Sequence, residues 1–108
     1  MLFDVQVLQR EGWSVVAVVG DVDLATLPAL RQGALGAGHE QVALDLSGVD
    51  LFDPLGFGIV VALQLRVARQ GGRFAVICPL GRARELFAES RVDQIVDVVD
   101  AFDELPRA

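Results

Sequence analysis

The chain has one cysteine, one histidine and no lysine among its 108 residues. A single thiol cannot form an internal disulfide, and Cys78 with His39 supplies too few soft ligands for a structural zinc site. Without lysine, the chain also lacks the Gly-x-x-x-x-Gly-Lys loop that holds nucleotide phosphates in many enzymes. We therefore expect no metal, no cofactor and no catalysis, with His39 at the surface and Cys78 in the core.

Long apolar runs are also missing. The longest, residues 14–20 and 57–63, fall short of the roughly 20 residues that cross a bilayer. Residues 1–4 show no basic segment of the kind that opens a secretory signal. Fifteen acidic and nine basic residues give a net charge of -6, which opposes binding to nucleic-acid phosphates. We expect a cytoplasmic protein without a membrane span and without direct contact to nucleic acid.

The apolar pattern predicts one α/β domain over residues 1–108, in the order β-β-α-β-α-β-α-β-α. A hydrophobic content of 53% is enough for one core at this length. The first two predicted strands, residues 2–8 and 13–19, form an antiparallel pair. Later strands alternate with helices, which requires right-handed crossovers and a parallel centre. We expect a mixed, mostly parallel sheet flanked by about four helices, with a core that includes Val15, Val18, Val42, Leu44, Val60, Leu63 and Val76.

Glycine, proline and aspartate mark the expected ends of the middle elements. Gly20 is expected to break the second strand, and Asp23 to cap a helix over residues 24–35. A third strand begins at residue 42 and is expected to end at Ser47-Gly48. The remaining predicted elements are a strand over 73–78, a helix over 81–89, an edge strand over 95–98 and a short helix over 101–105.

The segment Asp53–Gly56 predicts the start of the second helix. Proline biases the preceding residue toward extended backbone, which suits an N-cap, and proline itself suits the first helical position. The helix is expected to run to Arg69 and to end at Gly71-Gly72. Gly56 and Gly58 near its start have two readings: they let a partner approach the backbone closely, or they let the helix pack on the sheet.

The run at residues 42–61, VALDLSGVDLFDPLGFGIVV, resembles the centre of STAS domains of the anti-sigma factor antagonist family. There, a strand ending in Asp-Leu-Ser-Gly-Val leads to Asp-Ser-Ser-Gly-Leu-Gly at the head of a helix. Residues 20–23, Gly-Asp-Val-Asp, resemble the acidic turn before the first helix of that family. Gly71-Gly72-Arg73, a strand and Pro79 resemble its later part. The resemblance covers essentially the whole chain and implies a STAS-like fold.

The resemblance implies a partner-switching role. Bacterial members of the family bind an anti-sigma factor, often a serine kinase of the histidine-kinase-like ATPase fold, and so release a sigma factor. Phosphorylation of a serine at the head of the second helix switches the binding off, because a phosphate adds about -1.5 to -2 charges at the interface. Carried over to this chain, the partner-binding surface comprises Asp21, Asp23, Asp53, Pro54, Leu55, Gly56, Phe57 and Gly58.

The chain departs from the family at the switch itself. The two positions that are usually serine or threonine are Pro54 and Leu55, and the phosphoacceptor corresponds to Leu55, which has no hydroxyl. The chain has no tyrosine, and Thr26 and Ser47 are expected to make local hydrogen bonds instead of replacing the phosphoacceptor. The sequence thus indicates an antagonist that phosphorylation at the usual position does not control.

Other readings stay open. STAS-like subunits also dock on the ATPases of transporters, and Pro54 and Leu55 are also compatible with a degenerate scaffold that binds no kinase. The expected partner is an anti-sigma factor of the serine-kinase-like ATPase fold or, in a homodimer, a second copy of the chain. An enzyme would need a magnesium or paired-carboxylate site at the strand ends. The candidate carboxylates for it are Asp21, Asp23, Asp45 and Asp53.

Overall fold

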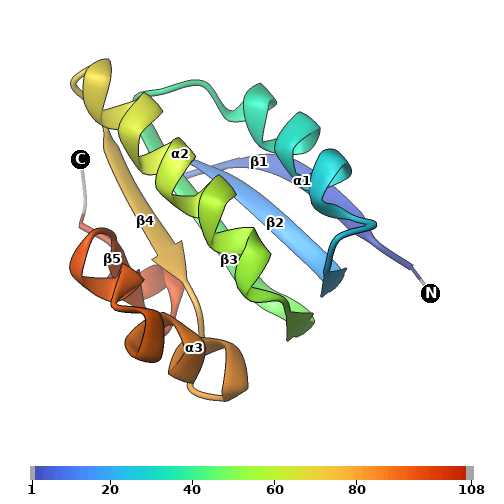
Figure 1. Cartoon of the computed structure of the whole chain (residues 1–108). Coiled ribbons are helices and arrows are strands. Elements are labelled where there is room, and N and C mark those ends of the chain that lie inside the picture. Colours follow the sequence, from blue (N-terminus) through green and yellow to red (C-terminus); the bar gives the residue numbers. More distant parts are fainter. Residues whose placement is uncertain (1, 107–108) are drawn as a thin grey trace.

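The computed structural model of the chain describes residues 2–106 and contains a five-stranded sheet whose strands lie side by side in chain order (Figure 1). The first pair is antiparallel and the other three pairs are parallel. This arrangement confirms the predicted mixed, mostly parallel sheet. The strands are β1 (Asp4–Arg10), β2 (Trp13–Val22), β3 (Gln41–Phe52), β4 (Arg73–Ile77) and β5 (Asp97–Val99).

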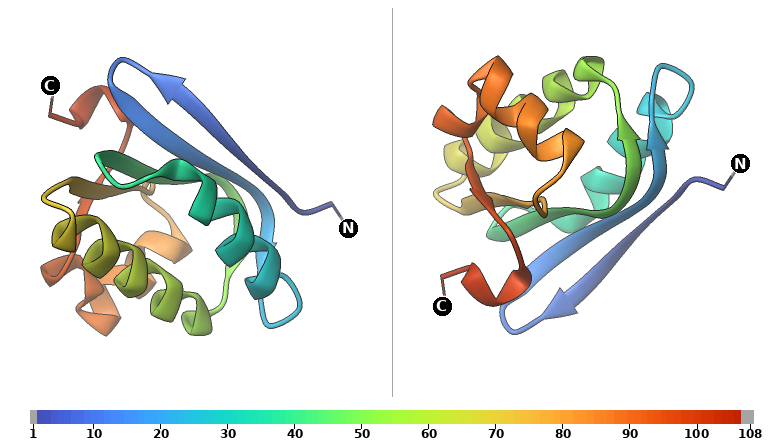
Figure 2. Two further views of the ribbon diagram at one scale, coloured as in Figure 1. Left: turned by 90° about the horizontal axis from the view of Figure 1, so that it is seen from above. Right: turned by 90° about the horizontal axis from the view of Figure 1, so that it is seen from below.

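The three α-helices of residues 2–106 cover one face of the sheet (Figure 2). They are α1 (Leu27–Ala34), α2 (Phe57–Arg69) and α3 (Arg82–Ser90). About four helices were expected, and the segment predicted as the fourth, residues 101–105, is instead a 3₁₀ turn, η4 (Phe102–Glu104). Its length is limited because Leu105 precedes Pro106, and proline pushes the residue before it out of the helical region. None of the helices in residues 2–106 is long and apolar enough to cross a bilayer.

Both faces of the sheet are packed. The larger core lies under the helices and includes Leu44, Val76 and Phe87. A smaller core on the opposite face joins Trp13 and Val15 to side chains of the last turn, η4. Each of the seven predicted core residues is buried, as expected, with Val15 in the smaller core.

Two strands are longer than the sequence predicted. β2 continues through Gly20 to Val22, and β3 continues through Ser47 and Gly48 to Phe52. Gly20 adopts φ of 110°, and a Cβ there would lie 2.3 Å from the carbonyl oxygen of Leu2, so the strand passes through a position that only glycine fits. Two irregularities in the β2–β3 register accommodate extra residues in β3. Gly48 therefore forms part of a bulged strand and does not end it.

The first helix begins later than predicted. Residues 23–26 form a closed turn, in which the Asp23 carboxylate accepts the Thr26 N–H at 3.0 Å. The Thr26 hydroxyl accepts the Asp23 N–H at 2.9 Å and donates to the Asp21 carbonyl oxygen at 2.8 Å. The Leu27 N–H also donates to the Asp23 carbonyl oxygen at 3.0 Å, but Pro28 has no N–H to continue a series of helical bonds from Leu24, so α1 starts only at Leu27. Asp23 caps this turn and not a helix that begins at Leu24.

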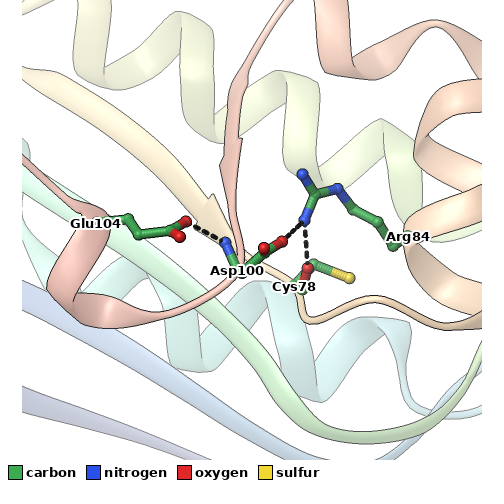
Figure 3. A network of polar contacts seen from close by, with 4 residues as sticks. All are labelled: Cys78, Arg84, Asp100 and Glu104. Carbon is green, nitrogen blue, oxygen red and sulfur yellow. Dashed lines mark hydrogen bonds and ion pairs between the residues drawn. The ribbon is translucent and has the colours of Figure 1, made fainter.

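The end of β4 is tied to α3 and to the last turn by polar contacts (Figure 3). Arg84 on α3 donates to the Cys78 carbonyl oxygen at 2.8 Å and forms an ion pair with Asp100. The Asp100 N–H donates in turn to the Glu104 carboxylate at 2.8 Å. The Cys78 thiol is buried, as expected, and this burial raises its pKa, whereas His39 is exposed.

Candidate functional site

The two segments predicted to form the partner surface lie next to each other where β2 and β3 end. Asp21 pairs with Leu51 and Val22 with Phe52 in the parallel ladder. Just beyond it, the Asp53 N–H donates to the Val22 carbonyl oxygen at 2.8 Å. The Asp21–Asp23 turn and the head of the second helix are therefore joined by backbone hydrogen bonds into one surface.

Asp53 caps the start of the second helical segment, as the sequence predicted. Its backbone is extended, and its carboxylate accepts the Leu55 N–H at 2.8 Å. The first turn is a 3₁₀ helix, η2 (Pro54–Gly56), and α2 follows from Phe57. The segment ends at Arg69 before Gly71-Gly72, also as predicted.

Three of the four carboxylates proposed for an enzyme, those of Asp23, Asp45 and Asp53, each accept a nearby backbone N–H. Asp23 holds the N–H of Thr26, Asp53 holds that of Leu55, and Asp45 accepts the Ser47 N–H at 2.9 Å. Within residues 2–106, no three Asp, Glu, His or Cys side chains are grouped as metal ligands would be. The chemistry these three residues share is the acceptance of hydrogen bonds from nearby backbone N–H groups.

The segments of this surface also carry exposed apolar side chains. Leu55 at the head of the helix has 58% of its area exposed, and Leu51 beside Asp21 has 53%. Leu24, in the turn after β2, is exposed to 73%. The sequence placed Leu24 at the start of a helix, and Leu51 falls in the part of β3 beyond its expected end at Ser47-Gly48. An exposed leucine in each of three neighbouring segments is a feature that a partner would cover.

The remaining predicted residues divide between surface and core. Pro54 and Gly58 are exposed, whereas Phe57 is half-buried, with its ring centroid 5.0 Å from that of Phe52 and 4.9 Å from that of Phe87. Phe57 therefore packs partly against the core and is only partly available to a binding partner.

The two glycines of this segment have different surroundings. A Cβ at Gly56 would lie 2.7 Å from Cζ of Phe52 and 3.1 Å from Cγ1 of Val22, so Gly56 lets the head of the helix pack on the sheet. A Cβ at Gly58 would meet no atom within 4 Å. Of the two readings given above, packing applies to Gly56, and close approach by a partner remains open only for Gly58.

Comparison with known proteins connects this geometry to a family. The family model described as "Mlab, STAS domain" matches residues 6–99. A protein of Thermotoga neapolitana named "Putative anti-sigma factor antagonist TM1081 homolog" is 30% identical over 70 residues, which are 65% of this chain. A Thermotoga maritima protein named "Putative anti-sigma factor antagonist" is 27% identical over 70 residues. The match spans 62% of the length of each of these two relatives.

Solved structures share the fold over most of the chain. An anti-sigma factor antagonist from Mycobacterium paratuberculosis superposes with a TM-score of 0.84 at 24% identity, covering 95% of this chain and 90% of that one. The unphosphorylated form of the anti-sigma factor antagonist SpoIIAA superposes with a TM-score of 0.66 at 19% identity, covering 95% and 92%. The family-model match from the first strand to the last, on the same five-stranded fold, shows that the chain belongs to the STAS domain family.

Proposed function

We propose that the chain is an anti-sigma factor antagonist, which binds an anti-sigma factor of the kinase-like ATPase fold and frees a sigma factor by partner switching. The observation that carries the proposal is the surface formed by the Asp21–Asp23 turn and Asp53–Gly58, with Leu55 exposed at the head of the helix. The names of the two Thermotoga relatives support the same role. We further propose that the protein acts in the cytoplasm by binding alone, without catalysis.

The surface combines the two contributions that protein interfaces use. Burying a fully exposed leucine contributes about 1.5–3 kcal/mol, and Leu55 has 58% of its area left to bury, so it fits the place of an apolar anchor. The carboxylates of Asp21, Asp23 and Asp53 belong to the same two segments and would steer a basic partner and fix its orientation.

We propose that this antagonist is not switched by phosphorylation at the usual position. Leu55 has no hydroxyl, and the backbone N–H that could otherwise contact a phosphate is bonded to Asp53. The nearest hydroxyl in the adjoining turn, that of Thr26, donates to the Asp21 carbonyl oxygen inside a half-buried turn. Control would then act through the amount of the protein or through another signal.

A second candidate function is a subunit that docks on a transporter ATPase. The fold also occurs as a part of the murine Slc26a9 anion transporter, with a TM-score of 0.71 at 16% identity over 89% of this chain and 17% of that one, so the fold alone is compatible with a role in transport. Titration of the purified chain with an anti-sigma kinase and with a transporter ATPase separates the two functions. A chain that binds neither would be a degenerate scaffold.

The first prediction concerns Leu55 as the anchor. Leu55→Asp places a fixed negative charge where the family carries phosphate, and we expect affinity for the anti-sigma factor to fall more than tenfold, or about 1.4 kcal/mol. Isothermal titration calorimetry measures the change. Leu65→Asp is the matched control, because Leu65 is exposed to 48% on α2 but lies outside the surface. Unchanged affinity of Leu55→Asp would exclude Leu55 from the interface.

The second prediction concerns the missing switch. Incubation of the chain with the anti-sigma kinase and radiolabelled ATP should leave it without label, whereas Leu55→Ser restores a hydroxyl and should be labelled. Detection is by autoradiography after electrophoresis. Stoichiometric labelling of the unmodified chain would contradict control that is independent of phosphorylation, and mass spectrometry would then identify the hydroxyl that was modified.

A further inference from the structure

A groove of about 200 Å³ runs between α1 and α2 on the helical face of the domain. Its floor is apolar and is formed by Ala34, Leu35, Ile59, Ala62 and Leu63. Gly58, Ala62 and Arg66 follow one another at intervals of four along α2, so they form one stripe facing the groove. The hollow exists because the first two positions of this stripe carry glycine and alanine, where larger side chains would fill the space between the helices.

Two arginines, Arg31 and Arg66, line the groove, and no acidic side chain does. Nη1 of Arg66 is shielded from solvent and has no hydrogen-bond partner among residues 2–106. In the same part of the chain, the arginines in ion pairs are Arg10, Arg82 and Arg84. Arg66 as a whole is half-buried and lines the groove, so the accessible part of its guanidinium is open to a ligand there, and an anion is the ligand that would pair with it.

We propose that this groove binds a short aliphatic monocarboxylate. The carboxylate would accept from the Arg66 guanidinium, which suits forked pairing with two oxygens, while the aliphatic chain covers the apolar floor. Sites for drug-sized ligands measure about 300–1,000 Å³, so a groove of about 200 Å³ suits a shorter ligand. Hexanoate, a six-carbon monocarboxylate, is the probe we choose for this class. A bare phosphate would leave the apolar floor unused.

This site is separate from the proposed anti-sigma interface. It shares only Gly58 with that surface, and its ligand is a small molecule, so neither assignment depends on the other. Because α2 lines the groove and also continues from the proposed partner surface, a bound carboxylate would lie on the same helix as the interface.

Titration of the ¹⁵N-labelled chain with hexanoate, followed by ¹H–¹⁵N NMR, tests the proposal. We expect saturable shifts of amides in residues 31–35 and 58–66. Acetate, which has the charge without the chain, and hexan-1-ol, which has the chain without the charge, should each bind at least tenfold more weakly. Absence of saturable shifts with hexanoate, or equal binding of hexan-1-ol, would overturn the proposal.

Three variants assign the contacts. Arg66→Gln should weaken hexanoate binding at least tenfold, and Ala62→Leu should abolish it by filling the groove from an exposed position. Arg69→Gln is the matched control, because Arg69 is exposed on the same helix outside the groove and should leave binding unchanged. If Arg66→Gln binds hexanoate with the affinity of the unmodified chain, the carboxylate does not pair with Arg66 and the proposal fails. A further outcome would also overturn the proposal: the unmodified chain does not bind hexanoate, and Ala62→Leu no longer binds the anti-sigma factor. The groove would then accept a side chain of that protein partner.

Discussion

Replacing Leu44 by alanine is expected to lower the free energy of unfolding by about 3–5 kcal/mol. Leu44 is fully buried in the middle of β3, where it pairs with Val16 of β2 on one side and Val76 of β4 on the other. Its side chain belongs to the larger core under the helices. Alanine would leave a cavity bounded by three strands and the helical layer, and close-packed surroundings of this kind collapse only in part.

Urea unfolding followed by circular dichroism measures this loss as a lower midpoint with an unchanged slope. The control is Leu65→Ala, because the same atoms are removed from a side chain that is 48% exposed on α2. That variant should lose less than about 1 kcal/mol, since little apolar area leaves the core. Equal midpoints for Leu44→Ala and the unmodified chain would mean that β3 does not occupy the centre of the sheet.

Valine at Gly56 is expected to destabilise the fold by about 3 kcal/mol, whereas valine at Gly58 should change stability by less than about 0.5 kcal/mol. At Gly56 the first added carbon would lie 2.7 Å from the Phe52 ring. That ring cannot move aside freely, because it is buried against Phe57 and Phe87, with ring centroids 5.0 and 5.7 Å away. At Gly58 the added carbon meets nothing within 4 Å.

The same pair of variants separates packing from binding, with thermal melting and partner titration as the two measurements. Gly58→Val should keep its melting temperature and lose affinity if the partner approaches the backbone there. Gly56→Val should lose stability with or without a partner. A stable Gly56→Val would show that the head of the helix does not press on Phe52.

The order of the elements and the larger core could be predicted because they depend on periodicity and on local signals. In Asp53-Pro54, aspartate predicts an N-cap and proline predicts the first helical position, and each residue has that role in the structure. The ends of β2 and β3 could not be predicted in this way. Gly20 and Ser47-Gly48 are turn formers by local preference, and the β2–β3 ladder holds them in extended, bulged strands through tertiary hydrogen bonds.

The sequence predicted which segments form the site, but it did not predict which of their side chains are exposed. The resemblance located the acidic turn and the head of α2, and the ladder joins them. The exposure of Leu24 depends on the closed turn at Asp23 and Thr26, which no periodicity argument contains. The groove between α1 and α2 depends on the distance between two helices that are separated along the chain by β3. The spacing of apolar residues along one sequence does not determine the distance between two helices.

The smaller core gives the protein an internal optical reporter. Trp13 is the only tryptophan, the chain has no tyrosine, and the indole N–H donates to the carbonyl oxygen of Pro106, 93 residues away, at 2.9 Å. The ring is 1% exposed beneath the last turn. Its emission therefore reports whether the last turn, η4, is seated against the first hairpin. The proposed partner surface lies at the opposite end of β2, so partner binding there should leave the emission of Trp13 unchanged. A change in this emission during a partner titration would therefore report unfolding near the last turn and not binding itself.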